Sequence, residues 1–458
     1  MNKTTKRAFA VIPVIALFLA ASVLLMYLFA ANGALWSSHK ANSHIFSSGQ
    51  ITNAGSVYDS FGVTLAYSSG GKRIYNSNSS IRRSTLHAVG DMSGVISTGA
   101  QAAYKKYLTG YSFVNGIYSL KKYGTGNDVY LSLCASACSA ALSSLSGFNG
   151  AVGAYNYKTG ELLCNVSAPT YDINNPPSDL HTNPKYDGIF LNRLFSGVYT
   201  PGSVMKIITA VCAIENIPDI SSRTFVCNGK VKIGGSDIIC MSTHGEITFS
   251  EALNKSCNCA FGEISRILGK DKLTATANSL GFNTALKADG INLAISTFDL
   301  SKANEHFVSW AGIGQYETLL NPCHMMMIAG AVANNGSGIS PSVINKIVSP
   351  SGITVFKSST PSAAVTINPA TAAALRSLLR SNVELQYGDY RFPNLKMCGK
   401  TGTAEIDGAA SHSWFVGFSL REDFPVAIVV IAENAGSGSG VAINTANAVM
   451  QSLLSNLL

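Results

Sequence analysis

The stretch "YTPGSVMKIITA", residues 199–210, places a serine and a lysine three positions apart at the start of an apolar segment. Pro201 and Gly202 interrupt the chain, and the residues after them predict a helix that enters a hydrophobic core. Lys206 follows Ser203 by about one helical turn, so both side chains face the same side. Taken alone, S-x-x-K arises by chance in most chains of this length. By itself it favours a serine near a helix start and a lysine that reaches solvent.

The composition is that of a folded protein. The chain has 458 residues, of which 47% are hydrophobic and only 13% are charged. Low charge combined with many aliphatic and aromatic residues argues against wholesale disorder. The length suits one large domain and a smaller one. The formal net charge of +8 is modest and forms no long basic run, so the sequence gives no support for nucleic-acid binding.

An uncharged segment lies near the N-terminus. "AFAVIPVIALFLAASVLLMYLFAA", residues 8–31, is longer than the roughly 20 residues that cross a bilayer. Lys3, Lys6 and Arg7 precede it, which predicts a cytoplasmic tail over residues 1–7 and an extracytoplasmic body. A cleaved signal peptide is the alternative, but its apolar region normally spans about 7 to 15 residues. We therefore expect a transmembrane signal anchor and a single-pass protein of the cell membrane.

The ten cysteines show neither a dense disulfide framework nor a paired C-x-x-C zinc pattern, so we expect no metal. Cys227 and Cys240 flank two strand-like runs around Gly-Gly, residues 228–239. A hairpin there would bring the two thiols together, which makes them a candidate disulfide. Cys257 and Cys259 are expected to pack inside a helix, since free cysteines most often behave as small buried hydrophobes.

The pattern along the chain predicts strands at both ends of the body. Residues 32–126 are rich in Ser, Gly and Asn and contain short alternating runs, which is typical of a small β-rich domain. Residues 127–145 predict a strand running into a helix, and residues 149–169 predict a hairpin. The chain then predicts mainly helix from 203 to about 337. Three strand-like runs and an amphipathic helix end the chain, so we expect one mixed sheet assembled from both ends.

Two further motifs raise the importance of Ser203. "SCN", residues 256–258, lies where an apolar helix begins, and "KTGT", residues 400–403, lies in a strand-like run. Each motif alone is weak. The ordered set S-x-x-K, S-x-N and K-T-G is characteristic of serine acyl-transfer enzymes that bind β-lactams.

The residue types suit that chemistry. A serine hydroxyl is a weak nucleophile that needs a neighbouring base. Burial would lower the pKa of Lys206 and let its free amine take the proton of Ser203. Ser256 would relay protons, and Asn258 would hydrogen-bond a substrate amide.

The K-T-G strand predicts the substrate-binding side of the site. Lys400 and Thr401 offer a cation and a hydroxyl to a carboxylate, and the strand backbone offers pairing to an extended peptide. The N–H groups of Ser203 and Thr403 are the expected oxyanion donors. Gly402 would let the substrate backbone approach closely.

The chain resembles the class B penicillin-binding proteins, the membrane-anchored D,D-transpeptidases of peptidoglycan synthesis. The resemblance runs from about residue 127 to the end. It is carried by "NRLFSGVYTPGSVMKIITA" (192–210), "HGEITFSEALNKSCNCAFGEI" (244–264) and "GKTGTAEIDGAASHSWFVGF" (399–418). The short segment before residue 127 is similar to the branch called penicillin-binding protein A. The pair Cys227 and Cys240 also resembles a C-x-G-to-C feature seen in many relatives.

The resemblance implies a fold of α/β class (α+β type), that of the serine β-lactamases and penicillin-binding transpeptidases. A mixed, mainly antiparallel sheet flanked by helices, with a helical subdomain, would occupy residues 127–458. The small β-rich domain, 32–126, and one transmembrane helix would precede it.

The resemblance also implies the reaction. Ser203 would attack the penultimate D-alanine carbonyl of a stem peptide ending in D-Ala-D-Ala and release the terminal D-alanine. An amine of a neighbouring stem would resolve the acyl-enzyme, and β-lactam antibiotics would acylate the same serine. No cofactor is implied. No glycosyltransferase domain fits before residue 127, so a partner glycosyltransferase in a wall-synthesis complex is expected.

Two other functions stay open from the sequence. A D,D-carboxypeptidase or a β-lactamase-like hydrolase differs in letting water resolve the acyl-enzyme. A catalytically idle scaffold would bind wall-synthesis partners through residues 32–125, although every motif position is intact in this chain.

Overall fold

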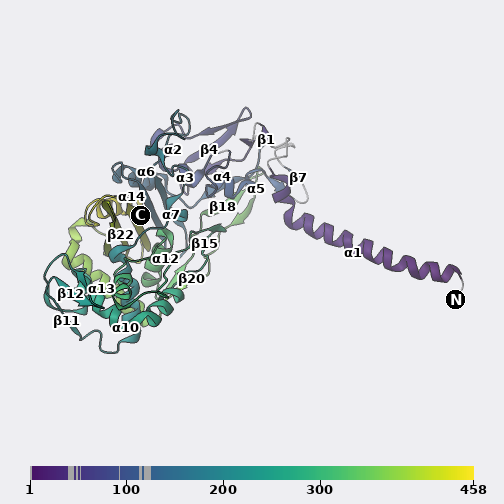
Figure 1. The fold of residues 1–458 in the computed structure, drawn as a ribbon. Helices are drawn as coiled ribbons and strands as arrows, with labels where there is room; N and C mark the ends of the chain where they lie inside the picture. Colours follow the sequence, from purple (N-terminus) through teal and green to yellow (C-terminus); the bar gives the residue numbers. More distant parts are fainter. Residues whose placement is uncertain are drawn as a thin grey trace.

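The computed structural model shows a body with one long helix projecting from it (Figure 1). The residues that the structure describes are 3–39, 46–47, 50–51, 53–91, 93–112, 116–117 and 125–458. Parts of the expected 32–126 domain therefore lie outside the described residues.

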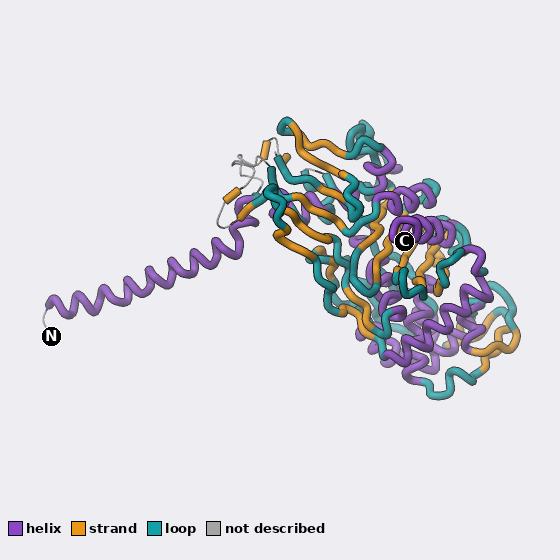
Figure 2. The backbone as a smooth tube through the Cα atoms, turned by 180° about the vertical axis from the view of Figure 1, so that it is seen from behind, coloured by secondary structure: helices purple, strands orange, loops and turns teal. Residues whose placement is uncertain are grey.

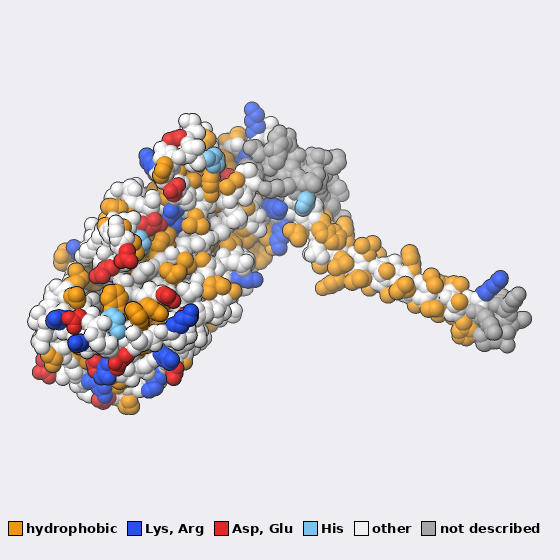
Figure 3. All heavy atoms as spheres, in the orientation of Figure 1, with side chains coloured by type: hydrophobic (Ala, Val, Ile, Leu, Met, Phe, Trp, Pro, Cys, Tyr) orange, Lys and Arg blue, Asp and Glu red, His pale blue; other side chains and the backbone are white. Residues whose placement is uncertain are grey.

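The projecting helix is α1 (Lys3–Ser37). Its apolar portion, Phe9–Ser37, has 29 residues, and an 18-residue window within it has a mean hydropathy of 2.7 and no residue buried inside the protein. In the space-filling view, hydrophobic side chains cover the visible face of this helix (Figure 3). Its length and composition are compatible with a single-pass membrane anchor, as the uncharged segment 8–31 predicts.

A five-stranded sheet forms the centre of the body, in the order β10-β9-β23-β22-β21. Every pairing in it is antiparallel. The predicted hairpin and the three late strand-like runs are confirmed, and they meet in one sheet as expected. The strands are β9 (Gly150–Asn156), β10 (Leu162–Ala168), β21 (Met397–Ile406), β22 (Ala409–Ser419) and β23 (Val426–Ala432).

Helices cover both faces of this sheet. Strands β10 and β23 are buried along their whole length, which requires cover on each side. Helices α6 (Ala135–Ser144) and α14 (Val441–Leu457) pack on one another and on the sheet. Helix α12 (Pro322–Ala333) packs on the sheet and on α13 (Pro369–Asn382).

The region from 203 to about 337 is helical only in part. Helices α8 (Lys206–Asn216), α9 (Phe249–Asn254), α10 (Asn258–Ser279) and α11 (Glu305–Gly312) confirm the prediction. Four strands interrupt them: the pattern predicted the two of the hairpin over residues 228–239 and missed the other two. They are β11 (Thr224–Cys227), β12 (Lys230–Ile233), β13 (Ser236–Ile239) and β14 (Gly245–Thr248), paired as β11 with β14 and β12 with β13.

A six-stranded sheet, in the order β19-β18-β8-β3-β4-β5, lies on the side of the body toward α1. Strand β8 (Asp128–Leu131) pairs in parallel with β3 (Val57–Tyr58), so this sheet takes strands from both sides of the expected boundary at 126/127. The boundary stays a prediction. Seen from behind, most helices of the body gather away from α1 (Figure 2).

Short elements complete the described chain. The helical ones are α2 (Ser79–Ser84), α3 (Leu86–Val89), α4 (Ala100–Ala103), α5 (Lys105–Leu108), α7 (Arg193–Ser196), η2 (Pro184–Tyr186), η3 (Gly202–Met205), η4 (Val383–Tyr387) and η5 (Asp389–Arg391). The strands are β1 (Phe46–Ser47), β2 (Gln50–Ile51), β4 (Thr64–Ser69), β5 (Lys72–Tyr75), β6 (Tyr111–Ser112), β7 (Gly116–Ile117), β15 (Lys287–Ala288), β16 (Ile291–Asn292), β17 (Ser337–Ile339), β18 (Ile344–Val348), β19 (Thr354–Lys357) and β20 (Ala363–Thr366).

The candidate disulfide between Cys227 and Cys240 is not formed. All ten cysteines are free and buried. The expected hairpin exists as β12 and β13, and it does bring the two thiols into one neighbourhood. Their side chains share that neighbourhood with His244 and Cys257 instead of bonding to each other.

Candidate active site

Ser203 and Lys206 lie on one continuous turn, from η3 into α8. Gly202 starts this turn with φ 54°, a conformation that suits glycine, and its N–H donates to the carbonyl of Gly314 over 2.9 Å. Ser203 is half-buried, whereas Lys206 is wholly buried. Lys206 Nζ lies 3.1 Å from Ser203 Oγ. Lys206 is therefore inside the protein beside the serine hydroxyl, as the three motifs together predict and as S-x-x-K alone does not.

The S-x-N segment surrounds the same ammonium. Lys206 Nζ donates to Ser256 O over 2.6 Å and to Asn258 Oδ1 over 2.8 Å, and it lies 3.2 Å from Ser256 Oγ. These two carbonyl-type acceptors are the shortest contacts, so they would engage both N–H bonds of a neutral amine. The lone pair of that amine is then left for the hydroxyl proton of Ser203. The arrangement suits a general base.

A second buried lysine extends the hydrogen-bond chain. Lys400 Nζ donates to Ser256 Oγ over 3.0 Å and to Thr401 O over 2.9 Å. The hydroxyl of Ser256 thus contacts both lysines. Burial, and then the positive charge of Lys206, holds the pKa of Lys400 well below its usual value. The order Ser203–Lys206–Ser256–Lys400 forms a path along which protons can be relayed.

The same burial sets the pH dependence of the site. Loss of solvation lowers the pKa of Lys206 to about 8. The base must be neutral, so we expect the rate constant for acylation of Ser203 by a penicillin to rise with pH and to level off above about pH 8. Stopped-flow acylation from about pH 6 to about pH 10 tests this. A flat or falling profile would argue against Lys206 as the base.

Strand β21 brings the K-T-G motif against the nucleophile turn. It is the last strand of its sheet, so its outer edge faces the site and offers backbone groups to an extended ligand. A Cβ on Gly202 would lie 2.5 Å from the carbonyl oxygen of Thr403, which makes the two segments neighbours. A Cβ on Gly402 would lie 3.0 Å from Pro201 O and from Trp414 Cβ. Gly402 is thus required for packing inside the protein, a reason that the sequence did not reveal.

The structure brings together the residues of all three motifs, as the sequence analysis expects. Their catalytic and oxyanion roles stay predictions, as do the roles of the Ser203 and Thr403 N–H groups.

Two positioning residues were not singled out as such by the sequence. Tyr387 Oη lies 3.0 Å from Thr401 Oγ1 and accepts the N–H of Thr401 over 3.0 Å, which fixes the start of the motif strand. Trp414 is fully buried. Its indole N–H donates to Thr200 O over 3.1 Å, just before the nucleophile turn. Neither residue belongs to a recognisable motif.

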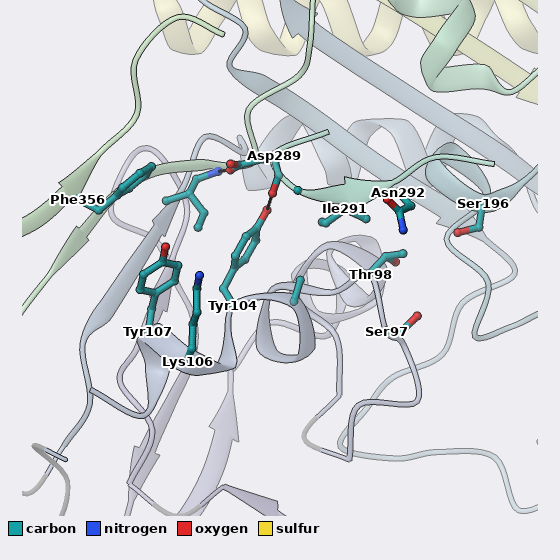
Figure 4. Close-up of a pocket in the computed structure, with 13 residues that line it drawn as sticks. Ser97, Thr98, Tyr104, Lys106, Tyr107, Ser196, Asp289, Ile291, Asn292 and Phe356 are labelled. Carbon is teal, nitrogen blue, oxygen red and sulfur yellow. Dashed lines mark hydrogen bonds between the residues drawn. The ribbon is translucent and has the colours of Figure 1, made fainter. Parts of the chain in front are cut away.

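A cavity of about 570 Å³ lies elsewhere, among α4, α5 and the β15–β16 hairpin (Figure 4). Tyr104 Oη donates there to Asp289 O over 3.2 Å, and Lys106 and Phe356 also line it. None of its lining residues belongs to the serine–lysine site, so it is separate from the candidate acyl-transfer centre.

An antiparallel sheet with a serine–lysine–serine–lysine path beside its edge strand, the two lysines buried, defines the serine acyl-transferases of the β-lactam-binding class. The chain belongs to the family described as penicillin binding protein transpeptidase domain, which matches residues 150–451. It is a class B protein of the PbpA type, as the resemblance in its sequence indicated.

Three relatives illustrate the likeness. Peptidoglycan D,D-transpeptidase PbpA of Mycolicibacterium smegmatis is 27% identical over 63% of this chain and 62% of its own length. The D,D-transpeptidase domain of a peptidoglycan glycosyltransferase from Eggerthella lenta is 27% identical, with a TM-score of 0.76 over 88% of this chain and 99% of that one. Penicillin-binding protein A from M. tuberculosis, as a ceftriaxone acyl-enzyme complex, shares the fold at 22% identity, with a TM-score of 0.76 over 88% and 98%.

Proposed function

We propose that this chain is a peptidoglycan D,D-transpeptidase that acts through an acyl-enzyme on Ser203. The observation that carries the proposal is the hydrogen-bond path from Ser203 Oγ through Lys206 and Ser256 to Lys400. It supplies a base for the nucleophile and a relay toward the leaving group. The family assignment and the PbpA relatives support the same reaction.

The steps follow from the positions of the side chains. Lys206 takes the Ser203 proton as Oγ bonds to the penultimate D-alanine carbonyl carbon of a stem peptide. The N–H groups of Ser203 and Thr403 stabilise the oxyanion. Ser256 passes a proton to the departing amine of the terminal D-alanine. A stem-peptide amine of a neighbouring strand then attacks the ester carbon, the bond from that carbon to Ser203 Oγ breaks as the new amide forms, and the proton lost by the amine returns to Ser203 Oγ through Lys206.

We also propose how the chain is organised and placed. Residues 1–7 form a cytoplasmic tail, 8–31 a membrane anchor, 32–126 a pedestal or interaction domain and 127–458 the extracytoplasmic transpeptidase domain. Helix α1 supports the anchor. A partner glycosyltransferase would supply the glycan strands whose stems are joined.

Ser203→Ala is expected to abolish covalent labelling by a penicillin, because the acylated oxygen is removed. Intact mass spectrometry of the full chain with benzylpenicillin should show one stable adduct in the wild type and none in the variant. Ser132→Ala, a buried serine in another part of the body, is the control and should label normally. An unlabelled wild type, or an adduct that survives Ser203→Ala, would refute the mechanism.

A second assay separates transferase from hydrolase. A stem-peptide thioester with a D-amino-acid acceptor should give the transfer product. Hydrolysis alone would instead identify a carboxypeptidase or β-lactamase-like enzyme.

A further inference from the structure

A cluster of three cysteines and one histidine lies next to the S-x-N motif and takes no part in the proposed acyl transfer. The ligand atoms of Cys227, Cys240, His244 and Cys257 all lie within 4.8 Å of one another. Cys240 Sγ is 3.9 Å from Cys257 Sγ and 3.6 Å from His244 Nδ1. Tetrahedral zinc with Zn–S of about 2.3 Å and Zn–N of about 2.0–2.1 Å places neighbouring ligand atoms about 3.6–3.8 Å apart. The two separations are close to this spacing, so the ligand atoms can surround one ion.

The backbone holds these four residues at four separate places in the chain. Cys227 ends β11, Cys240 follows β13, His244 precedes β14 and Cys257 caps the start of α10. His244 N–H donates to Cys227 O over 3.1 Å, and Cys240 N–H donates to the carbonyl of Gly229 over 2.8 Å. The three thiols are buried and the imidazole is half-buried. The ligand side chains thus converge because the chain is fixed around them.

Backbone donors point at two of the sulfur atoms. The N–H of Asn258 donates to Cys240 Sγ over 3.4 Å, and the N–H of Ala260 donates to Cys257 Sγ over 3.4 Å. Outer hydrogen bonds of this kind orient and stabilise metal-bound ligands. They are a second observation, independent of the clustering, that favours thiolate ligands.

A disulfide explains this cluster less well. A bond between Cys227 and Cys240 needs the two sulfur atoms about 2.05 Å apart. It would not explain why Cys257 and His244 lie beside the same two sulfur atoms. Three sulfurs and one imidazole nitrogen around a common centre make a complete set for a closed zinc site.

We propose that Cys227, Cys240, His244 and Cys257 bind one zinc ion as a structural site. Thiolate and imidazole ligands in a tetrahedral arrangement favour zinc over harder cations. Binding releases the protons of the three thiols, and all four positions are filled by protein, so the ion leaves no position for substrate. The strands β11–β14 are short and partly exposed, and small units of this kind often need such a cross-link.

The site connects directly to the acyl-transfer centre. Cys257 is the middle residue of the S-x-N motif, so the ion ties Ser256 and Asn258 to strands β11–β14. Ser256 has φ 53°, an uncommon conformation that the surrounding structure must hold in place. Figure 1 shows β11 and β12 beside α10 at the end of the body far from α1. The zinc site therefore positions the second serine of the proton path from outside the substrate cleft.

The full-length chain in detergent provides the test. After incubation with zinc sulfate and gel filtration, elemental analysis is expected to give about one zinc per chain. X-ray absorption at the zinc edge should show three sulfur ligands at about 2.3 Å and one nitrogen at about 2.0–2.1 Å. A chain without stoichiometric zinc would overturn the proposal, whether its thiols are free or Cys227 and Cys240 are oxidised to a disulfide.

Variants separate a ligand from a merely buried thiol. Cys240→Ser and Cys257→Ser should each weaken zinc binding by at least about tenfold. Cys212→Ser is the matched control, since Cys212 is a buried cysteine of α8 outside the cluster, and it should keep the metal. If the ligand variants do not fold, the metal content and the absorption spectrum of the wild type still show whether the site binds zinc. The metal content is measured without a β-lactam, so the two proposals can fail separately. The chain could lack zinc while a penicillin still labels Ser203, or it could bind zinc while no penicillin labels Ser203.

Discussion

Lys206→Met is expected to lower the rate constant of acylation by a penicillin by about 10²–10⁴-fold, the usual contribution of a general base. Among the described residues, Lys206 Nζ makes the one side-chain hydrogen bond to Ser203 Oγ. Methionine fills a similar volume but cannot accept the serine proton. The nucleophile then keeps its position and loses its activation. Stopped-flow measurement with a chromogenic cephalosporin reads the loss directly.

The melting temperature of Lys206→Met is expected to stay the same or to rise. The ammonium is fully buried, and this burial is the main cause of its lowered pKa. Methionine removes the desolvation penalty of the buried ammonium, which offsets the loss of its hydrogen bonds to Ser256 O and Asn258 Oδ1. Lys158→Met, a change of an exposed lysine in the β9–β10 turn, should alter neither acylation nor melting temperature. Wild-type acylation by Lys206→Met would remove the lysine from the mechanism, and a large fall in melting temperature would show that it supports the fold.

The three motifs of the candidate site could be recognised in the sequence because each motif is local. Ser203 and Lys206 are one turn apart, so the helix alone places them together. The convergence of Ser256 and Lys400 on that turn depends on segments far apart in the chain. No local pattern contains that information, and the expectation rested on the order of the motifs and on the family resemblance.

The sheet was predictable for a similar reason. Strands β9 and β23 are buried on both faces, so each appears in the sequence as a long, nearly continuous apolar run. Strands β11 and β14 were missed because each has only four residues, with exposed and buried positions mixed. Such runs carry little periodicity, so the helices around them dominated the prediction.

The cysteines show where side-chain direction becomes decisive. The hairpin between Cys227 and Cys240 was predicted, and their proximity followed from it. The sequence could not predict which atoms each thiol contacts, because Cys257 reaches the thiols of Cys227 and Cys240 from a different element. The spacings between these residues match none of the compact zinc patterns, so the cluster is visible only in three dimensions.

Gly202→Ala is expected to lower acylation by at least about 10²-fold, the effect of misplacing a nucleophile by about 1 Å. Gly202 has φ 54°, which an alanine adopts only with strain. The added Cβ would also lie 2.5 Å from Thr403 O, and this neighbour is backbone that cannot rotate away. Either the nucleophile turn or strand β21 must move, and each carries one of the two expected oxyanion donors. Acylation kinetics, with the melting temperature measured in parallel, test the effect.

Gly408→Ala separates crowding from backbone strain. Gly408 also has a positive φ, 71°, but a Cβ there would meet nothing within 4 Å. It lies in the turn between β21 and β22, on the same pair of strands that carries the K-T-G motif. The strain alone should cost about 1–2 kcal/mol of stability and leave the acylation rate unchanged. If Gly408→Ala slowed acylation as much as Gly202→Ala, general strain would be responsible. Acylation at the wild-type rate in Gly202→Ala would mean that the close approach of Gly202 to Thr403 does not shape the site.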